Sequence, residues 1–205
     1  MFQRWSWHSK FRHPVFCIAD PLTIGHDRVP LAWYQGDSQS IYLEKIVTEL
    51  ISSLGDRALN SETIAFGSSG GGFAALLCAQ LGLVDVAIAV NPQTNLLQFS
   101  DKAAVSAFLN RRKKLGLELF DSCYSLVDVG FSKIRPKARI VYVQNISDTN
   151  HYIEHMAPYV AGIFRSTNIS TFNLCCHYND SLGHNPPGLT EISELLGPLF
   201  TKLLK

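Results

Sequence analysis

The sequence contains one serine in a setting that predicts a nucleophile. Residues 64–73 read Ile-Ala-Phe-Gly-Ser-Ser-Gly-Gly-Gly-Phe, so Gly67, Ser69 and Gly71 fit the pattern Gly-x-Ser-x-Gly. In that pattern the serine lies on a strained turn between a strand and a helix, and the flanking glycines let the two elements pack closely. The N–H of Gly70, at the start of the predicted helix, would face a developing oxyanion. The expected chemistry is attack of Ser69 on an acyl carbonyl.

A glycine-rich turn between a strand and a helix also occurs in loops that bind phosphate and in turns without chemistry. The segment lacks the Lys-Ser/Thr pair of a Walker loop, and its glycine spacing does not match Gly-x-Gly-x-x-Gly. The predicted strand before the motif and the predicted helix after it favour the nucleophile.

His184 is the predicted general base for Ser69. It lies in Ser-Leu-Gly-His-Asn-Pro-Pro-Gly, residues 181–188, between a predicted strand at 171–176 and a predicted helix at 190–204. A loop in this place leaves the sheet at the same edge as Ser69, because parallel strands end at one edge. Glycine and proline on either side of the histidine would hold its ring in place.

Asp148 is the predicted third member of a catalytic triad. It follows the apolar strand predicted at 138–143, on the sheet edge expected for the other two residues. Its carboxylate would accept the Nδ1–H of His184, fix the tautomer and stabilise the imidazolium. Asp180, four residues before His184, is the alternative carboxylate.

Other polar residues could bind a substrate or a metal. His151 and His155 are four residues apart and share a helix face, but no His-Glu-x-x-His pattern and no third ligand accompany them. We interpret them as a polar helix face and predict neither a metal nor an organic cofactor. Two amides, Asn91 and Gln93, follow one predicted strand, and Trp33 ends another. Amide and aromatic side chains suit a bound sugar. A plain turn explains the two amides equally well, and core packing explains Trp33 equally well.

The elements around these residues alternate between strands and helices. Short apolar runs predict strands at 15–19, 30–34, 63–66, 84–90, 138–143 and 171–176, and amphipathic spacing predicts helices at 43–54, 73–81, 101–114, 152–164 and 190–204. This alternation is typical of the α/β class, with a mostly parallel sheet of about six strands in a three-layer α/β/α sandwich.

The order Ser69, Asp148, His184, each after a predicted strand, resembles the α/β-hydrolase superfamily. The resemblance spans residues 14–204 and implies a minimal α/β-hydrolase fold with a Ser-His-Asp triad. It also implies a second oxyanion N–H from a loop after an early strand. That loop reads Asp-Pro-Leu-Thr at 20–23 and departs from the usual His-Gly pattern, so Leu22 is the candidate donor, with Asp20 as an alternative.

A narrower likeness concerns the segment 67–75 together with Val-Asn-Pro-Gln-Thr at 90–94. These residues resemble a bacterial branch associated with surface-glycan assembly, some members of which are similar to carbohydrate O-acetyltransferases of accessory secretion systems. The likeness implies a serine ester hydrolase, such as a carboxylesterase or deacetylase, or an O-acyltransferase that acts on a small-molecule or glycan ester. Further domains or partner proteins of a glycan pathway are also expected. The alternative is a non-catalytic glycan-binding or scaffolding module in polysaccharide biosynthesis.

Composition agrees with one globular domain over residues 1–205. The chain is 46% hydrophobic and 17% charged, and its net charge of +1 gives it no electrostatic attraction to nucleic acid or to an anionic membrane. No run of about 18 apolar residues predicts a membrane span. Five cysteines in no disulfide-like spacing indicate buried, reduced thiols, so we expect a reducing, cytoplasmic compartment.

Overall fold

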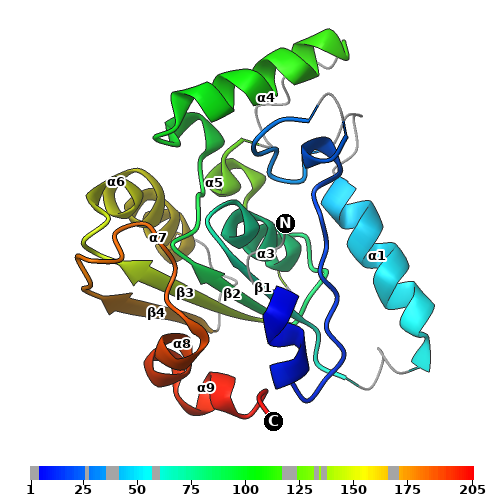
Figure 1. Cartoon of the computed structure of the whole chain (residues 1–205), viewed down its shortest axis with the longest axis vertical. Helices are drawn as coiled ribbons and strands as arrows, with labels where there is room; N and C mark the ends of the chain where they lie inside the picture. The colour runs from blue at the N-terminus through cyan, green and yellow to red at the C-terminus, as the bar shows by residue number, and fades with distance from the viewer. Residues whose placement is uncertain are drawn as a thin grey trace.

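The computed structural model shows an α/β fold, with a parallel sheet covered by helices on both faces (Figure 1). It describes residues 5–25, 28–35, 42–56, 61–116, 124–131, 134, 138–165 and 171–205. The general α/β class predicted from the alternating pattern is therefore confirmed. Within the described ranges, no helix is both long and apolar enough to cross a lipid bilayer.

The sheet described has four parallel strands in the order β1-β2-β3-β4. Their bounds are Ile64–Ser68 for β1, Val86–Val90 for β2, Arg139–Asn145 for β3 and Phe172–His177 for β4. Ser68 pairs with Val90, and Val90 with Val143. The three strands therefore end side by side, and the loops that follow them emerge at one edge.

Alternate residues of the strands enter two separate cores. Val86, Ile88 and Val90 of β2 face a core closed by η1 (Trp5–Lys10), α8 (Leu189–Leu196) and α9 (Pro198–Thr201). Ala87 and Ala89 face the other core. Figure 1 shows that other side covered by α3 (Gly70–Gln80), α5 (Leu126–Val129) and α7 (Ala157–Phe164), with α1 (Tyr42–Leu54) and α4 (Lys102–Lys114) farther out. The small alanine side chains let α3 approach the sheet.

The predicted six-strand sheet is wrong, because neither early segment forms a strand. Val15 and Phe16 are 42% and 50% exposed, and the backbone at 15–19 is extended without pairing to a neighbour. In the segment predicted at 30–34, Trp33 and Tyr34 have φ of 50° and 56°, which a strand does not allow. An apolar run alone does not show whether a partner strand is present.

Several predicted helices and thiols also differ in detail. The helix predicted at 152–164 is a π-helical turn, η5 (Tyr152–Met156), followed by α7, and it continues α6 (Thr149–His151). The helix predicted at 190–204 breaks at Gly197, which has φ of 52°.

The described cysteines are free thiols, as expected: Cys17, Cys78, Cys175 and Cys176. Cys17 and Cys176 are exposed rather than buried, and Cys123 lies outside the described residues.

The turn between β1 and α3 brings two backbones into contact. A Cβ on Gly67 would lie 2.1 Å from the carbonyl oxygen of Gly71, and a Cβ on Gly72 would lie 2.7 Å from Cβ of Pro92. Nothing lies within 4 Å of a Cβ built on Gly71. The glycine requirement predicted for Gly67 and Gly71 thus holds at Gly67, is wrong at Gly71, and applies at Gly72 instead.

We expect Gly67→Ala to lower the free energy of unfolding by about 3 kcal/mol, because its new methyl group meets backbone that cannot move aside. Gly71→Ala, four residues later in α3, is the matched control. Its stability should stay within about 1 kcal/mol of wild type. Urea unfolding followed by circular dichroism measures both values, and equal destabilisation by the two variants would contradict this packing.

Candidate active site

Ser69 lies at the tight turn between β1 and α3 in a backbone conformation that exposes its hydroxyl. Its φ is 52° and its ψ is −119°, a combination that costs a residue with a side chain about 1–3 kcal/mol. Its N–H donates to the carbonyl of Val90 at 3.0 Å, and its own carbonyl accepts the N–H of Phe73 at 3.1 Å. Strand β2 and helix α3 therefore hold the strained residue from both sides.

The structure brings together Ser69, His184 and Asp148, in the order expected from the sequence. Nε2 of His184 lies 3.0 Å from Oγ of Ser69, and Nδ1 of His184 lies 2.8 Å from Oδ2 of Asp148. The carboxylate accepts the Nδ1–H, so Nε2 is free to accept the serine hydroxyl proton. Asp180, the alternative carboxylate, is exposed to solvent.

Asp148 is fixed at the start of α6. Its Oδ1 accepts the backbone N–H of His151 at 3.3 Å, which caps the helix. Burial alone would raise the pKa of this carboxyl, but the hydrogen bonds from His151 and His184 outweigh burial and lower the pKa well below its ordinary value. Asp148 therefore remains ionised throughout the neutral range.

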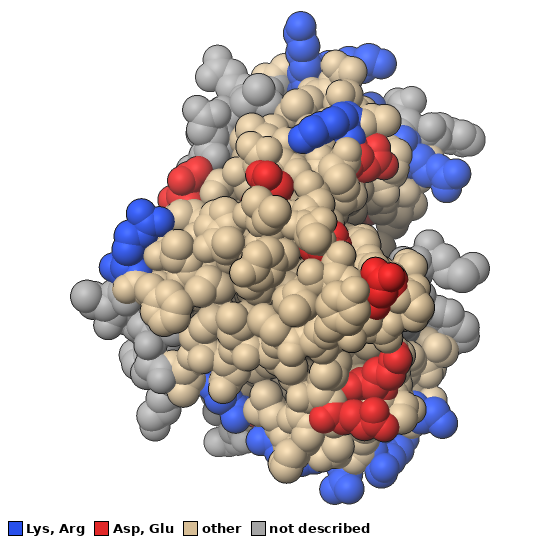
Figure 2. All heavy atoms as spheres, turned by 90° about the vertical axis from the view of Figure 1, so that its left-hand side faces the viewer, with Lys and Arg blue, Asp and Glu red and all other residues tan. Residues whose placement is uncertain are grey.

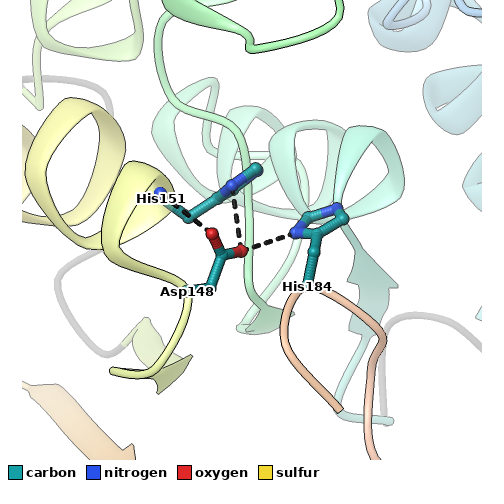
Figure 3. Close-up of side chains that lie close together, drawn as sticks. All are labelled: Asp148, His151 and His184. Atoms are coloured by element: carbon teal, nitrogen blue, oxygen red, sulfur yellow. Dashed lines mark hydrogen bonds and ion pairs between the residues drawn. The ribbon is translucent and has the colours of Figure 1, made fainter. Parts of the chain in front are cut away.

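His151 is a second histidine on the same carboxylate, and the sequence analysis did not assign it to the site. Its Nδ1 lies 3.0 Å from Oδ2 of Asp148, the oxygen that also binds His184 (Figure 3). Its ring stacks on the ring of His184, with centroids 4.0 Å apart. His151 and His155 are 2% and 0% exposed, so their interpretation as a polar helix face is wrong. Both point inward because α6 and η5 present this face to the sheet edge.

The two buried histidines are neutral. Burial lowers the pKa of His151 and outweighs the opposing effect of Asp148. Burial also lowers the pKa of His155 to about 3. Nδ1 of His155 accepts the N–H groups of Thr94 and Asn95 at 3.2 and 3.4 Å, so its proton resides on Nε2. His151 has the opposite tautomer, because its Nδ1 must donate to a carboxylate.

Buried asparagine side chains hold the loop that presents His184. Asn91 accepts the backbone N–H of Asn145 at 2.8 Å and donates to the carbonyl of His184 at 3.3 Å. Asn145 in turn donates to the carbonyls of Asn179 and Gly183 at 2.7 and 2.9 Å. Asn91 was predicted to contact a substrate, but its amide is occupied by hydrogen bonds within the chain, and the residue is fully buried.

Gln93 contacts the serine directly and has a fixed orientation. Its Nε2 donates to Oγ of Ser69 at 2.9 Å. Its Oε1 accepts the indole N–H of Trp33. An indole nitrogen only donates, so the amide oxygen must face Trp33 and the amide nitrogen must face Ser69. Both residues are fully buried, which places Trp33 behind the site rather than on a surface that meets a substrate.

The two predicted oxyanion donors lie in different surroundings. Gly70 is the first residue of α3, where backbone N–H groups have no acceptor within the helix. The N–H of Leu22 donates to Oδ1 of Asp20 at 3.2 Å, at the start of the short helix η2 (Pro21–Thr23). Asp20 is itself buried, and its Oδ2 accepts the N–H of Tyr34 at 2.6 Å. In this arrangement the Leu22 N–H is occupied within the chain.

The face around the site carries little basic charge. Strands β3 and β4 end on the left in Figure 1, so Figure 2 looks onto the carboxyl edge of the sheet. The middle of this face is mostly neither acidic nor basic, with some carboxylates and with Lys and Arg toward its margins. Exposed apolar side chains follow the strands there: Ile146 after β3, Tyr152 and Ile153 in the helical turns beyond it, and Tyr178 after β4.

Asp148, His151 and His184 could also hold a metal ion, since their ligand atoms lie within 4.8 Å of one another. Two imidazoles and one carboxylate form a ligand set that suits zinc. Each Nδ1 already has Oδ2 of Asp148 as its partner, however, so this cluster is satisfied without a cation. The same hydrogen bonds are those that a serine-dependent reaction would use.

Comparison with known proteins gives a likeness in structure. No protein-family model and no curated protein sequence matches the chain. Among the solved structures that it resembles is the capsule O-acetyltransferase of Neisseria meningitidis serogroup A, with a TM-score of 0.53 and 19% identity. The match covers 72% of this chain and 61% of that one. At this identity the likeness shows a shared fold.

Exhaustive dialysis against EDTA should leave the melting temperature of the protein unchanged within about 1 °C, because the hydrogen bonds of the Asp148 cluster need no cation. Differential scanning fluorimetry before and after dialysis measures this. A structural metal would contribute folding free energy, so a fall of several degrees that zinc reverses would contradict this prediction.

Proposed function

We propose that the protein is a serine-dependent ester hydrolase or O-acyltransferase of the α/β-hydrolase type, and that it acts through an acyl-enzyme on Ser69. The observation that supports this most strongly is the continuous hydrogen-bonded chain from Ser69 Oγ through His184 to Asp148, at 3.0 and 2.8 Å. Such a chain, on a strained strand-to-helix turn, is the arrangement that activates a serine. The fold shared with a capsule O-acetyltransferase also agrees with acyl transfer.

The reaction has two steps, and His184 acts first as base and then as acid in each. In the first, Ser69 Oγ bonds to the ester carbonyl carbon while its proton moves to Nε2 of His184. The tetrahedral intermediate then collapses, the C–O bond to the leaving group breaks, and His184 returns the proton to the departing oxygen. In the second, water or a sugar hydroxyl gives its proton to His184 and attacks the acyl carbon. The bond from that carbon to Ser69 Oγ then breaks, and His184 returns the proton to Oγ, which releases the product and restores Ser69. Asp148 stays ionised and stabilises the imidazolium in both steps.

The N–H of Gly70 is the proposed first donor to the oxyanion. For the second donor we assign the side-chain amide of Gln93 in place of the Leu22 N–H. Gln93 Nε2 already lies 2.9 Å from Ser69 Oγ, whereas the Leu22 N–H is bonded to Asp20. The amide nitrogen of Gln93 carries two hydrogens. One can stay hydrogen-bonded to Ser69 Oγ while the other donates to the carbonyl oxygen of the ester that Ser69 attacks. The Trp33 indole holds this amide in place, so little reorganisation is needed during the reaction.

The proposed substrate is an uncharged acylated carbohydrate. Exposed tyrosines at 152 and 178 and the scarcity of basic side chains at the middle of the carboxyl-edge face suit a neutral polar ligand better than a polyanion (Figure 2). The name of one structural neighbour, a capsule O-acetyltransferase, also agrees with an acylated substrate. Whether water or a sugar resolves the acyl-enzyme depends on the acceptor that reaches it, and both routes use the same residues.

Ser69→Ala should reduce p-nitrophenyl acetate turnover by about a thousand-fold or more, since it removes the nucleophile. Asp148→Asn should cause a loss of similar size, because an amide can hold His184 in the wrong tautomer. Asp180→Asn is the matched control, and it should retain wild-type kcat/KM because Asp180 is exposed and outside the triad. Product analysis with a free sugar as acceptor then separates transfer from hydrolysis.

If the folded wild type turns over no ester and binds glycans all the same, the catalytic proposal fails, and the non-catalytic glycan-binding module becomes the better account. If Asp180→Asn is as damaging as Asp148→Asn, the assignment of the carboxylate is wrong.

Gln93→Ala should lower kcat by about a hundred-fold, which is the usual consequence of removing one oxyanion donor. Gln98→Ala, at an exposed glutamine in the next turn of chain, is the control and should leave kcat unchanged. Steady-state kinetics with p-nitrophenyl acetate separates kcat from KM. A Gln93→Ala variant that raises KM at constant kcat would place Gln93 in substrate binding instead.

A further inference from the structure

We propose that His151 is a positioning residue for the reaction, and that Asp148 serves two imidazoles at once. This inference rests on the proposed function, because it assigns His151 a part in the work of His184. His151 would act without touching the substrate. It would hold the Asp148 carboxylate and the plane of the His184 ring.

The geometry places one oxygen between two N–H donors. Oδ2 of Asp148 accepts from Nδ1 of His184 at 2.8 Å and from Nδ1 of His151 at 3.0 Å (Figure 3). The second oxygen of the carboxylate accepts the backbone N–H of His151 at 3.3 Å. His151 thus binds both oxygens, and the carboxylate cannot rotate without losing one of these bonds. This fixes the direction in which Oδ2 faces His184.

Stacking on His151 fixes the plane of the His184 ring. The rings of His151 and His184 are 4.0 Å apart at the centroids and 29° from parallel. His184 has a side chain 39% exposed, so its own loop leaves one side of the ring uncovered. His151 is 2% exposed and is supported by the edge of Phe99, with centroids 6.2 Å apart. The buried His151 ring therefore restricts the orientation of the more exposed His184 ring.

The charge state of His151 matters to this role. His151 must be neutral to share Asp148 without repelling the imidazolium that forms on His184, and burial lowers its pKa and keeps it so. The other titratable groups that face the pair are Asp148, His155 on η5 and Lys102 on α4. Of these, Asp148 is the only one with a negative charge.

Two substitutions separate the hydrogen bond from the stacking. His151→Phe keeps an aromatic ring beside His184 and removes the N–H. His151→Asn keeps a donor, because Nδ2 of asparagine, like Nδ1 of histidine, is bonded directly to Cγ, and it removes the ring. Glu154→Gln is the matched control on the same helical run, because Glu154 is half-buried and the substitution keeps the size of its side chain.

We expect His151→Phe to lower kcat by about 10- to 100-fold, the size of effect that follows from misplacing a catalytic group by about 1 Å. KM should stay near the wild-type value, because His151 does not touch the substrate. His151→Asn, which keeps a donor to Asp148, should lose less kcat than His151→Phe. Glu154→Gln should keep the wild-type kcat.

Proton NMR tests the shared carboxylate without any turnover. Wild type and Ser69→Ala should each show two low-field imidazole Nδ1–H resonances, one from His184 and one from His151, which nitrogen-15 correlation distinguishes from the Nε2–H of His155. His151→Phe should keep only the Nδ1–H resonance of His184. If both resonances are present but no form of the protein turns over ester, the proposed function fails while the shared carboxylate stands.

The proposal is overturned if wild type shows a single low-field Nδ1–H resonance. It is also overturned if folded His151→Phe keeps the wild-type kcat, or if His151→Asn lowers kcat as far as His151→Phe does. Should His151→Phe fail to fold by circular dichroism, the wild-type resonances and the kcat of His151→Asn decide the matter.

Discussion

The whole site depends on the backbone contact between strand β1 and helix α3. A Cβ on Gly67 would lie 2.1 Å from the carbonyl oxygen of Gly71, so only glycine lets the chain pass this tightly from strand to helix. Ser69, in the middle of the turn, has φ of 52°. The strain is held by the hydrogen bond from Ser69 to Val90 and by the packing of Gly72 on Pro92. The position of the Ser69 hydroxyl is thus a consequence of close packing between two elements.

The remaining residues of the site reach Ser69 because the sheet is parallel. The parallel strands end at one edge of the sheet, so the loops after β2, β3 and β4 place Gln93, Asp148 and His184 close together. The loops are held by polar side chains that have no exposure to solvent, above all Asn91 and Asn145. Buried amides of this kind bond to backbone groups that the sheet leaves unpaired, and they give the loops a single arrangement.

Sequence patterns predicted much of this arrangement but not its buried polar contacts. The α/β class and the placement of Ser69, Asp148 and His184 followed from where each lies relative to an apolar run. Two strands at 15–19 and 30–34 were predicted wrongly, because apolar character does not reveal whether a partner strand is present. His151 was misread because helical spacing identifies which residues share a face and not whether that face is buried. The roles of Trp33 and Asn91 depend on contacts 50 or more residues away in the chain, which no local pattern contains.

The central claim is that Ser69 is an activated nucleophile. Labelling the folded protein with a fluorophosphonate and mapping the modified peptide by mass spectrometry tests it most directly, since the reagent reacts with a serine only where a base and an oxyanion site assist. The account predicts one adduct per chain, located on Ser69 and lost when the protein is unfolded before labelling. No adduct, or an adduct on a different residue with Ser69 unmodified, would contradict it.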